Sequence, residues 1–324
     1  MVAIQLALFW ISEYRAHFLQ NTSIVKTAIS IGNFDAVHIG HVALVRAARE
    51  AVGNEGKVIL LSFDPLPVAI LRPDIKIGRI TSFKQRQGLL LEAGADEVHQ
   101  ITPNKELLNT TPEVFIQDIV RTYVPTVIVE GSGFRFGKGR SGNFTTLQSL
   151  GEMHGFACIE IDGIKIKLDK KELFRASSSV IRALLEDGAV ANAAMVLGRS
   201  YSIEGTVVEG DKRGRTLGFP TANLADVSSM LPRNGIYAGI TEIQGETYSC
   251  AISIGTKPTF GKHERVCEVH IIGFDGEIGR YDWFLRVTMA HWIRDQKKFE
   301  SVDALKTAIQ QDIQQVITLT ESNS

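Results

Sequence analysis

Cysteine is scarce in this sequence. Its 324 residues include three cysteines, Cys158, Cys250 and Cys267, and no two of them have CxxC spacing. An odd number of cysteines without that spacing predicts neither a disulfide framework nor a zinc site. Free thiols in a reducing compartment are the simpler interpretation, which favours a cytoplasmic protein.

Excess charge of one sign is also missing. The net charge is −1, so no global field attracts the chain to nucleic acid or to an anionic membrane. Residues 2–11 are apolar apart from Gln5, but this run is too short to span a bilayer and no basic residue precedes it. We therefore expect no nucleic-acid partner, no membrane association and no signal peptide. The sequence leaves open the role of residues 1–20 and the oligomeric state.

Low-complexity linkers and internal repeats are absent as well. Hydrophobic residues make up 44% of the chain and charged residues 22%, as in an ordinary globular protein. A chain of 324 residues is long enough for two domains.

The first half of the chain alternates strand patterns with helix patterns. Apolar runs predict buried strands at residues 24–31, 57–63 and 126–129. Helix patterns lie between and around them, and they cover residues 42–52, 83–92 and 111–123. This order predicts a parallel sheet with helices on both faces, which binds ligands beyond the carboxyl ends of its strands.

The most informative stretch is residues 30–41, which read Ser-Ile-Gly-Asn-Phe-Asp-Ala-Val-His-Ile-Gly-His. It predicts a strand end, a tight turn and a helix start, and a helix N-terminus can hold phosphate through its unpaired N–H groups. Gly32 lets the backbone approach a ligand. His38 and His41 are three residues apart, so they can lie on one side of the first turn and donate hydrogen bonds to phosphate oxygens. The alternative is a pair of surface histidines beside a turn.

Two further stretches of the first half carry polar groups. Residues 130–143 follow a predicted strand and contain five glycines and three cationic residues, a composition typical of a loop that approaches an anion. A plain solvated loop is the alternative. In residues 176–182, the hydroxyls of Ser177 and Ser178 and the guanidinium of Arg182 could hold triphosphate oxygens. Taken alone, this second stretch favours an ordinary helix cap.

The second half has the pattern of an antiparallel barrel. Short strands separated by tight turns are predicted at residues 201–209, 236–243, 247–254, 266–272 and 283–291. A final helix is predicted over residues 301–319, with an apolar stripe that begins at Val302 and ends at Val316. The change of pattern places a domain boundary within residues 186–198.

A glycine-rich basic loop lies near the start of this second half. Residues 205–223 contain four glycines and three basic residues, and they end in Gly-Phe-Pro-Thr-Ala-Asn. Such a loop can wrap phosphate, and the side-chain oxygens of Thr221 and Asn223 suit a hard ion such as Mg²⁺. A bare hairpin loop is the alternative, and it would need fewer glycines.

These motifs resemble two known families. Residues 30–41 are similar to the phosphate-binding signature of the HxGH nucleotidylyltransferases, whereas residues 218–223, 234–238, 254–260 and 267–270 resemble the riboflavin kinase module. The motifs occur in the order found in the bacterial bifunctional riboflavin kinase/FAD synthetase family, and the resemblance covers nearly the whole chain.

The resemblance implies an α/β fold followed by a barrel. Residues 1–186 would form a Rossmann-like FMN adenylyltransferase domain. Residues 187–324 would form a riboflavin kinase domain, an antiparallel β-barrel with a C-terminal helix.

For the second domain, the resemblance implies transfer of the γ-phosphate of ATP to riboflavin, giving FMN and ADP. Glu268 would be the general base that takes the proton of the ribityl 5′-hydroxyl. The alternative for Glu268 is a strand residue that points to solvent. Thr221 and Asn223 would hold Mg²⁺. The residues implied to bind ATP are Gly205, Lys212, Gly214, Gly218, Pro220, Thr221 and Asn223.

For the first domain, the resemblance implies transfer of the adenylyl group of a second ATP to FMN, giving FAD and pyrophosphate. His38, His41 and Arg182 would be the catalytic residues. The residues implied to bind nucleotide or flavin are Gly32, Asn33, Phe34, Asp35, Arg135, Ser177 and Ser178. The partners would then be riboflavin, FMN, FAD and ATP, with Mg²⁺ as the cofactor.

Four positions of the first domain depart from the family pattern. Ala36 stands where glycine is usual, Leu66 where histidine is, Gly133 where aspartate or asparagine is, and Val180 where arginine is. Loss of several electrostatic contacts would cost a few kcal/mol of transition-state stabilisation, or roughly 10²-fold in rate. We therefore expect a competent kinase joined to an adenylyltransferase that is weakened or adapted.

Two alternatives remain. In the first, the protein is a monofunctional riboflavin kinase whose first domain is a non-catalytic flavin- or nucleotide-binding module. In the second, it is a non-catalytic flavin-binding protein, which the intact Thr221, Asn223 and Glu268 argue against.

Overall fold

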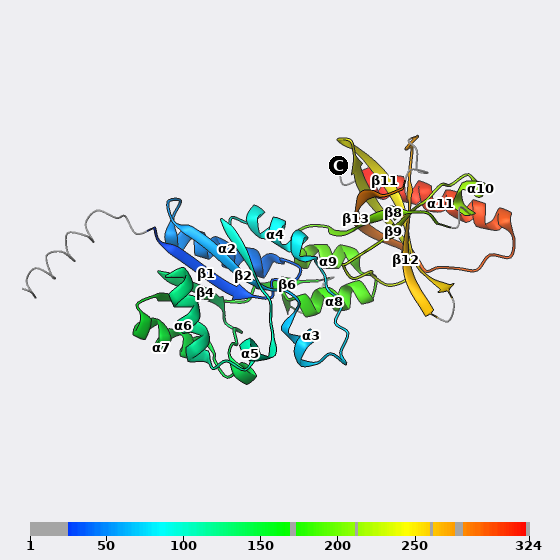
Figure 1. Cartoon of the computed structure of the whole chain (residues 1–324). Helices are drawn as coiled ribbons and strands as arrows, with labels where there is room; N and C mark the ends of the chain where they lie inside the picture. Colours follow the sequence, from blue (N-terminus) through cyan, green and yellow to red (C-terminus); the bar gives the residue numbers. More distant parts are fainter. Residues whose placement is uncertain (1–24, 169–172, 211–212, 260–261, 276–280, 322–324) are drawn as a thin grey trace, which may run out of the picture.

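The computed structural model describes residues 25–168, 173–210, 213–259, 262–275 and 281–321. Figure 1 shows a helix-covered sheet and a barrel beside each other, with helices α8 (Ser178–Glu186) and α9 (Val190–Leu197) between them. In the described part of the chain, no helix has the length and apolar character needed to cross a membrane. The apolar run at residues 2–11 lies outside the described ranges.

The first domain is built on a parallel sheet in the order β3-β2-β1-β4-β5. Its strands are β1 (Thr27–Gly32), β2 (Lys57–Phe63), β3 (Glu97–Ile101), β4 (Val127–Gly131) and β5 (Ala157–Ile161). The three central strands coincide with the predicted apolar runs, because strands covered on both faces have no polar side. β3 and β5 are the edge strands and have no such run.

Helices cover both faces of this sheet, as the alternating pattern predicts. They are α2 (Ile39–Val52), α3 (Pro67–Leu71), α4 (Phe83–Glu92), α5 (Lys105–Leu108), α6 (Pro112–Tyr123), the short η1 (Lys138–Arg140) and α7 (Phe144–His154). α2 packs on one face through Val45 and Ala48. Ile116 of α6 and Leu147 of α7 pack on the other face. A hairpin of β6 (Lys165–Lys167) and β7 (Leu173–Arg175) follows β5.

The sheet opens between β1 and β4. β1 pairs with β2 up to Gly32, whereas its pairing with β4 ends at Ile29. The chain crosses from one side of β1 to the other between β3 and β4, so this opening is the switch point at which parallel sheets form a ligand crevice. The buried side chain of Glu130 lies in the opening, and its Oε1 accepts a 2.6 Å hydrogen bond from the amide of Ile31.

Replacing Glu130 with glutamine is expected to raise the unfolding temperature at pH 8 and to leave it nearly unchanged at pH 4.5. Burial raises the pKa of Glu130 well above its usual value of 4.5. The folded state therefore keeps a proton that the unfolded chain releases, so the stability linked to this proton is complete below pH 4.5 and falls as the pH rises toward the folded-state pKa. Glutamine keeps an acceptor for the Ile31 amide and cannot ionise.

Thermal unfolding between pH 4.5 and pH 8 measures this effect. The control is Glu152→Gln, because Glu152 is exposed on α7. Parallel stability curves for the wild-type chain and Glu130→Gln would contradict the argument.

The second domain is a closed antiparallel barrel in the order β10-β11-β12-β9-β8-β13. Its strands are β8 (Tyr201–Val208), β9 (Ala222–Ala225), β10 (Gly235–Ile243), β11 (Glu246–Thr259), β12 (Lys262–Ile271) and β13 (Trp283–Arg294), and α10 (Arg213–Leu217) lies in the glycine-rich loop. The barrel interior holds apolar side chains such as Ile203, Ile252 and Val287. An α/β domain followed by an antiparallel barrel and a C-terminal helix confirms the predicted fold class.

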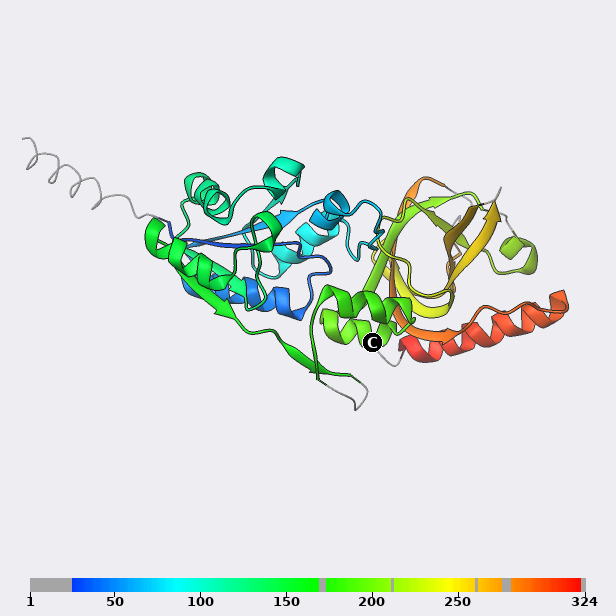
Figure 2. The same cartoon turned by 90° about the horizontal axis from the view of Figure 1, so that it is seen from below.

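The C-terminal helix α11 (Val302–Glu321) lies along the outside of the barrel (Figure 2). Val316 of the predicted apolar stripe is buried, but Val302 is 57% exposed. The stripe prediction is therefore wrong at its first residue, because the barrel does not cover the first turn of α11. Asp312 of α11 is buried instead, and its carboxylate accepts two hydrogen bonds of 2.8 and 2.6 Å from Arg294 of β13.

α8 and α9 connect the two domains through one apolar core. Ile181 of α8 and Val196 of α9 belong to the same buried cluster as the barrel interior, and this cluster also includes Ala36 and Ile80 of the first domain. The predicted domain boundary, after residue 186, falls in the turn between these two helices.

Candidate active sites

The turn after β1 has an unusual backbone. Phe34, Ala36 and Val37 have φ angles of 47°, 82° and 45°, which lie in the left-handed region that favours glycine. Ala36 replaces the glycine of the family pattern at a position where a Cβ does cause strain. The turn leads directly into α2, whose N-cap residue is His38.

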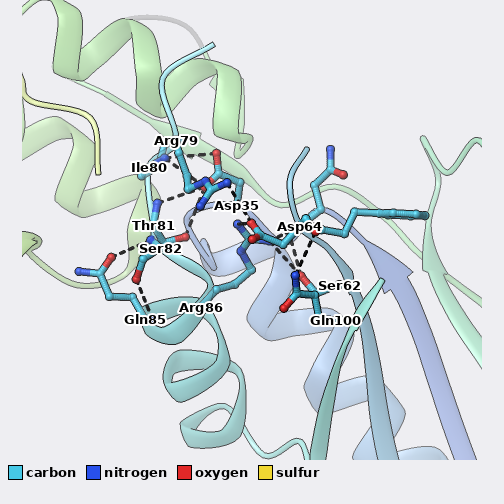
Figure 3. Close-up of polar contacts among 12 residues, drawn as sticks. Asp35, Ser62, Asp64, Arg79, Ile80, Thr81, Ser82, Gln85, Arg86 and Gln100 are labelled. Atoms are coloured by element: carbon cyan, nitrogen blue, oxygen red, sulfur yellow. Dashed lines mark hydrogen bonds and ion pairs between the residues drawn. The ribbon is translucent and has the colours of Figure 1, made fainter. Parts of the chain in front are cut away.

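The carboxylate of Asp35 ties this turn to a neighbouring segment (Figure 3). Asp35 is 1% exposed and accepts hydrogen bonds from the amides of Ile80 and Thr81. It also forms a close ion pair with Arg182 of α8, whose Nε donates a 2.7 Å hydrogen bond to the carbonyl of Gly78. The structure therefore brings together Asp35 and Arg182, two predicted site residues, and binds them to each other.

His38 is held in its neutral form. Its Nδ1 accepts a 3.2 Å hydrogen bond from the amide of Gly40, so Nε2 carries the ring proton. Burial, followed by the nearby charge of Arg199, lowers the pKa of His38 from 6.5 to about 4. At neutral pH this side chain can therefore donate a hydrogen bond to a phosphate oxygen without being a cation.

The structure brings His41 onto His38, as their spacing predicts. The two rings are stacked with 3.7 Å between their centroids. Burial, followed by repulsion from His38 when that ring is protonated, lowers the pKa of His41 well below its usual value. Nδ1 of His41 is buried and bonds to no described residue. A buried ring nitrogen is costly to leave unpaired, so this atom is available to a polar group beside the two histidines.

The other predicted residues near β1 differ in exposure. Asn33 is exposed, whereas Phe34 is buried with its ring centroid 5.3 Å from that of His41. A Cβ on Gly32 would lie 3.4 Å from the ring of Phe34, which is an ordinary van der Waals contact. Arg135 is exposed, and its Nη1 donates a 2.7 Å hydrogen bond to the carbonyl of the preceding residue.

The two serines at the start of α8 have different partners. Ser177 is the N-cap, and its hydroxyl accepts a 3.3 Å hydrogen bond from the amide of Val180. Ser178 donates a 2.7 Å hydrogen bond to the carbonyl of Asp35. The cap predicted for this stretch is present, and the same helix start also contacts the histidine turn.

A buried arginine outside the predicted motifs lies close to this turn (Figure 3). Arg86 of α4 is 0% exposed. Its Nη1 donates to the hydroxyl of Ser62 at 3.1 Å and to the carbonyl of Phe63 at 2.8 Å, and its Nη2 lies 3.5 Å from Oδ1 of Asp64. Its charge also contributes to the lowered pKa of His41. No sequence signal marks Arg86, because an arginine within a helix is ordinarily exposed.

The remaining departures from the family pattern lie in three different environments. Leu66 is buried at the N-cap of α3. Val180 packs against the core shared by α8, α9 and the barrel. A Cβ on Gly133 would lie 3.5 Å from both Nη1 and Nη2 of Arg175, so a cation is present next to the missing side chain.

The barrel domain contains a cavity of about 1060 Å³ between its strands and α11. Thr221, Asn223 and Glu268 line this cavity together, and Glu268 of β12 is the register partner of Asn223 of β9. Cys267 and Val269 are buried in the barrel core. Because alternate residues of a strand point to opposite sides, Glu268 points away from this core and into the cavity.

The glycine-rich loop lies against these polar residues. Gly214 lines the cavity. A Cβ on Gly210 would lie 2.1 Å from the side-chain nitrogen Nδ2 of Asn223. The carbonyl of Pro220 accepts a 2.8 Å hydrogen bond from the ring of His270, which also lines the cavity.

Two predicted ATP-binding glycines lie outside the set of residues that line the cavity. Gly218 follows α10 with a φ of 89°. Gly205 lies within β8, where a Cβ would lie 2.6 Å from the carbonyl oxygen of Ala225. Glycine is therefore needed there for the packing of the strands. Lys212 lies outside the described residues.

The cavity offers oxygen ligands for a hard cation. Within the described ranges, no group of three or more His, Cys, Asp or Glu side chains could hold a metal ion. Mg²⁺, however, uses one or two protein ligands and completes its shell with waters and phosphate oxygens. The side-chain oxygens of Thr221 and Asn223 line one cavity and suit such a hard cation.

Known proteins match the two halves of the chain. Two family models match it, FAD synthetase at residues 20–172 and riboflavin kinase at residues 197–320. A bifunctional riboflavin kinase/FMN adenylyltransferase of Escherichia coli (strain K12) is 33% identical over 305 residues, which are 91% of this chain and 93% of that protein. This chain belongs to the bifunctional riboflavin kinase/FMN adenylyltransferase family.

Other relatives cover similar shares of the chain. The protein of the same name from Bacillus subtilis (strain 168) is 30% identical over 308 residues, which are 93% of this chain and 95% of that protein. A crystal structure of a macrolide-efflux protein from Streptococcus pneumoniae has a TM-score of 0.80 and 28% sequence identity, and the match covers 90% of this chain and 94% of that chain.

Membership of this family confirms the predicted enzyme class and the two-step function, from riboflavin to FMN and from FMN to FAD. The monofunctional alternative is not favoured, because both catalytic domains match. Residues 173–196 lie between the two matched ranges. This segment includes α8 with Ser177, Ser178 and Arg182, so their roles depend on the geometry described above.

Proposed function

We propose that the kinase step takes place in the barrel cavity with Glu268 as the general base. Glu268 would take the proton of the ribityl 5′-hydroxyl, the hydroxyl oxygen would form a bond to the γ-phosphorus of ATP, and ADP would leave, giving FMN. The observation that carries this assignment is that Glu268, Thr221 and Asn223 line one cavity of about 1060 Å³.

We propose that Thr221 and Asn223 hold the Mg²⁺ of the kinase site. When bound there, Mg²⁺ neutralises charge on the phosphate oxygens of ATP. Asn223 packs under Gly210, and Thr221 lies near Gly214, where a Cβ would be 3.3 Å from its hydroxyl oxygen. The glycines of the loop therefore let its backbone approach both ligands closely.

We propose that the adenylyl step takes place at the turn after β1. A phosphate oxygen of FMN would form a bond to the α-phosphorus of ATP, and pyrophosphate would leave. His38 and His41 would donate hydrogen bonds to the phosphate oxygens as neutral imidazoles. Arg182, with Ser177 and Ser178, would hold the triphosphate from the start of α8, which already contacts this turn through Asp35.

The four departures are proposed to slow the adenylyl step without abolishing it. Arg175 supplies a cation beside Gly133, and Arg86 supplies one near His41. Leu66 and Val180 are apolar. The family pattern has a possible phosphate donor at the first position and a cation at the second. We therefore expect FAD to form more slowly than FMN.

A product time course tests both steps. The purified chain is incubated with riboflavin and MgATP, and riboflavin, FMN and FAD are separated by chromatography. We expect FMN to accumulate first and FAD to follow, with no product when Mg²⁺ is removed by a chelator. FMN without FAD would favour a monofunctional kinase, and absence of both products would contradict the kinase assignment.

We propose that the adenylyltransferase domain ends at Glu186 and that the kinase domain begins at Asp187. We also propose a cytoplasmic location, because both steps consume ATP. Riboflavin, FMN, FAD and ATP would be the partners, and the net charge of −1 gives no reason to expect nucleic acid or a membrane among them.

A further inference from the structure

Arg199 links the kinase part of the chain to the histidine turn of the adenylyltransferase part. It follows α9 and its cap residue Gly198, within the range matched by the riboflavin kinase family. Its Nη2 donates a 2.6 Å hydrogen bond to the carbonyl of Ala36, and its Nη1 donates a 2.8 Å hydrogen bond to the carbonyl of Val37. One guanidinium therefore holds two consecutive carbonyls of the turn, 163 and 162 residues away in sequence.

These two carbonyls belong to the part of the turn that needs support. Ala36 and Val37 have φ angles of 82° and 45°, which residues with a Cβ rarely adopt, and Val37 is β-branched. Such conformations persist where the surroundings fix them, and they gather at functional sites. The next residue is His38, the N-cap of α2, so the direction of this backbone decides where the two stacked imidazoles lie.

A second contact from the barrel acts on the segment that holds Asp35. The hydroxyl of Tyr201 in β8 donates to the carbonyl of Met230 at 2.6 Å and lies 3.4 Å from the carbonyl of Ile80. The amide of Met230 donates a 2.6 Å hydrogen bond to the carbonyl of Arg79. Because residues 80 and 81 bind the carboxylate of Asp35, the kinase part of the chain contacts the turn directly through Arg199 and indirectly through Tyr201 and Met230.

We propose that Arg199 is a positioning residue for adenylyl transfer, which keeps the turn and His38 in the reactive arrangement by binding the carbonyls of Ala36 and Val37. The inference rests on the proposed adenylyl step at His38 and His41. It makes that step dependent on a residue of the kinase part of the chain, which acts through the turn.

The full-length variant Arg199→Met tests this proposal through its two activities. We expect kcat for FAD and pyrophosphate formation from FMN and MgATP to fall by about 10²-fold, the size of effect that a small misplacement of reacting groups produces. FMN formation from riboflavin should change less than about twofold, because the kinase cavity is lined by other residues. For Arg199→Lys, kcat for FAD formation should lie between the values of the wild-type chain and Arg199→Met, since an ammonium lacks the planar fork that donates to two carbonyls.

The matched control is Arg121→Met, because Arg121 is exposed on α6 and pairs only with a neighbour one turn away among the contacts described. The decisive second variant is Ala36→Gly in the Arg199→Met chain. Glycine adopts a φ of 82° without strain. The double variant should therefore form FAD at least about tenfold faster than Arg199→Met does. A merely structural role of Arg199 would give no such recovery.

The outcomes separate the proposal from the function on which it rests. A wild-type chain that forms no FAD would overturn both. In a chain that does form FAD, an unchanged adenylyl rate in Arg199→Met, an equal loss of both activities, or the absence of recovery with Ala36→Gly would each overturn the positioning role. If Arg199→Met does not fold, the same comparison is made between Arg199→Lys and its Ala36→Gly double variant.

Discussion

A chain with methionine in place of Arg86 is expected to have a free energy of unfolding about 3–5 kcal/mol lower than the wild-type chain. Arg86 is fully buried and donates to the Ser62 hydroxyl and the Phe63 carbonyl, and it lies 3.5 Å from Asp64. Methionine fills much of the same volume but leaves two acceptors without this donor and removes a countercharge from a carboxylate that is 13% exposed. The contacts that are lost lie at the carboxyl end of β2, beside the histidine turn.

Differential scanning calorimetry measures this effect. For a domain of this size, the unfolding temperature falls by about 2–4 °C for each kcal/mol lost from the free energy of unfolding. The unfolding temperature of the first domain should therefore fall by roughly 10 °C. Arg121→Met serves again as the control, since its exposed pair with Asp118 contributes at most about 1 kcal/mol. An Arg86→Met shift no larger than that of Arg121→Met would show that the buried network is not what holds this part of the sheet.

The second large effect is expected at Glu268. Glu268→Gln should lower kcat for FMN formation by about 10²–10⁴-fold, because the amide keeps the size of the side chain but cannot take the proton of the ribityl hydroxyl. Glu268 lines the cavity beside Thr221 and Asn223, so binding of MgATP should be retained and the KM for ATP should change little.

A coupled assay for ADP release follows this step. Glu242→Gln is the control, since Glu242 is exposed on β10. If Glu268→Gln keeps a wild-type kcat, another group removes the proton, and the general-base assignment is wrong.

The sequence predicts the centre of each domain better than its margins. β1, β2 and β4 are buried on both faces, so their apolar runs are continuous. The edge strands β3 and β5 are only partly covered and mix polar with apolar residues, which leaves no clear period. β9 has four residues and lies at the end of the glycine-rich loop, so its pattern is too short to detect.

The candidate sites show the same division between local and distant information. His38, His41, Thr221, Asn223 and Glu268 belong to short motifs, which sequence can reveal because each motif is one segment of chain. The partners of buried charges depend on packing between distant segments. Arg182 meets Asp35 across 147 residues, and no pattern in a single sequence marks such a pair.

The central claim is that one chain carries two separate active sites, and Glu268→Gln and His41→Gln together test it most directly. Each variant is given riboflavin or FMN with MgATP, and FMN and FAD are measured by chromatography. We predict that Glu268→Gln forms FAD from FMN at the wild-type rate but little FMN from riboflavin. We predict that His41→Gln forms FMN from riboflavin normally but loses about 10²–10³-fold in FAD formation. Loss of both steps in either variant would contradict the account.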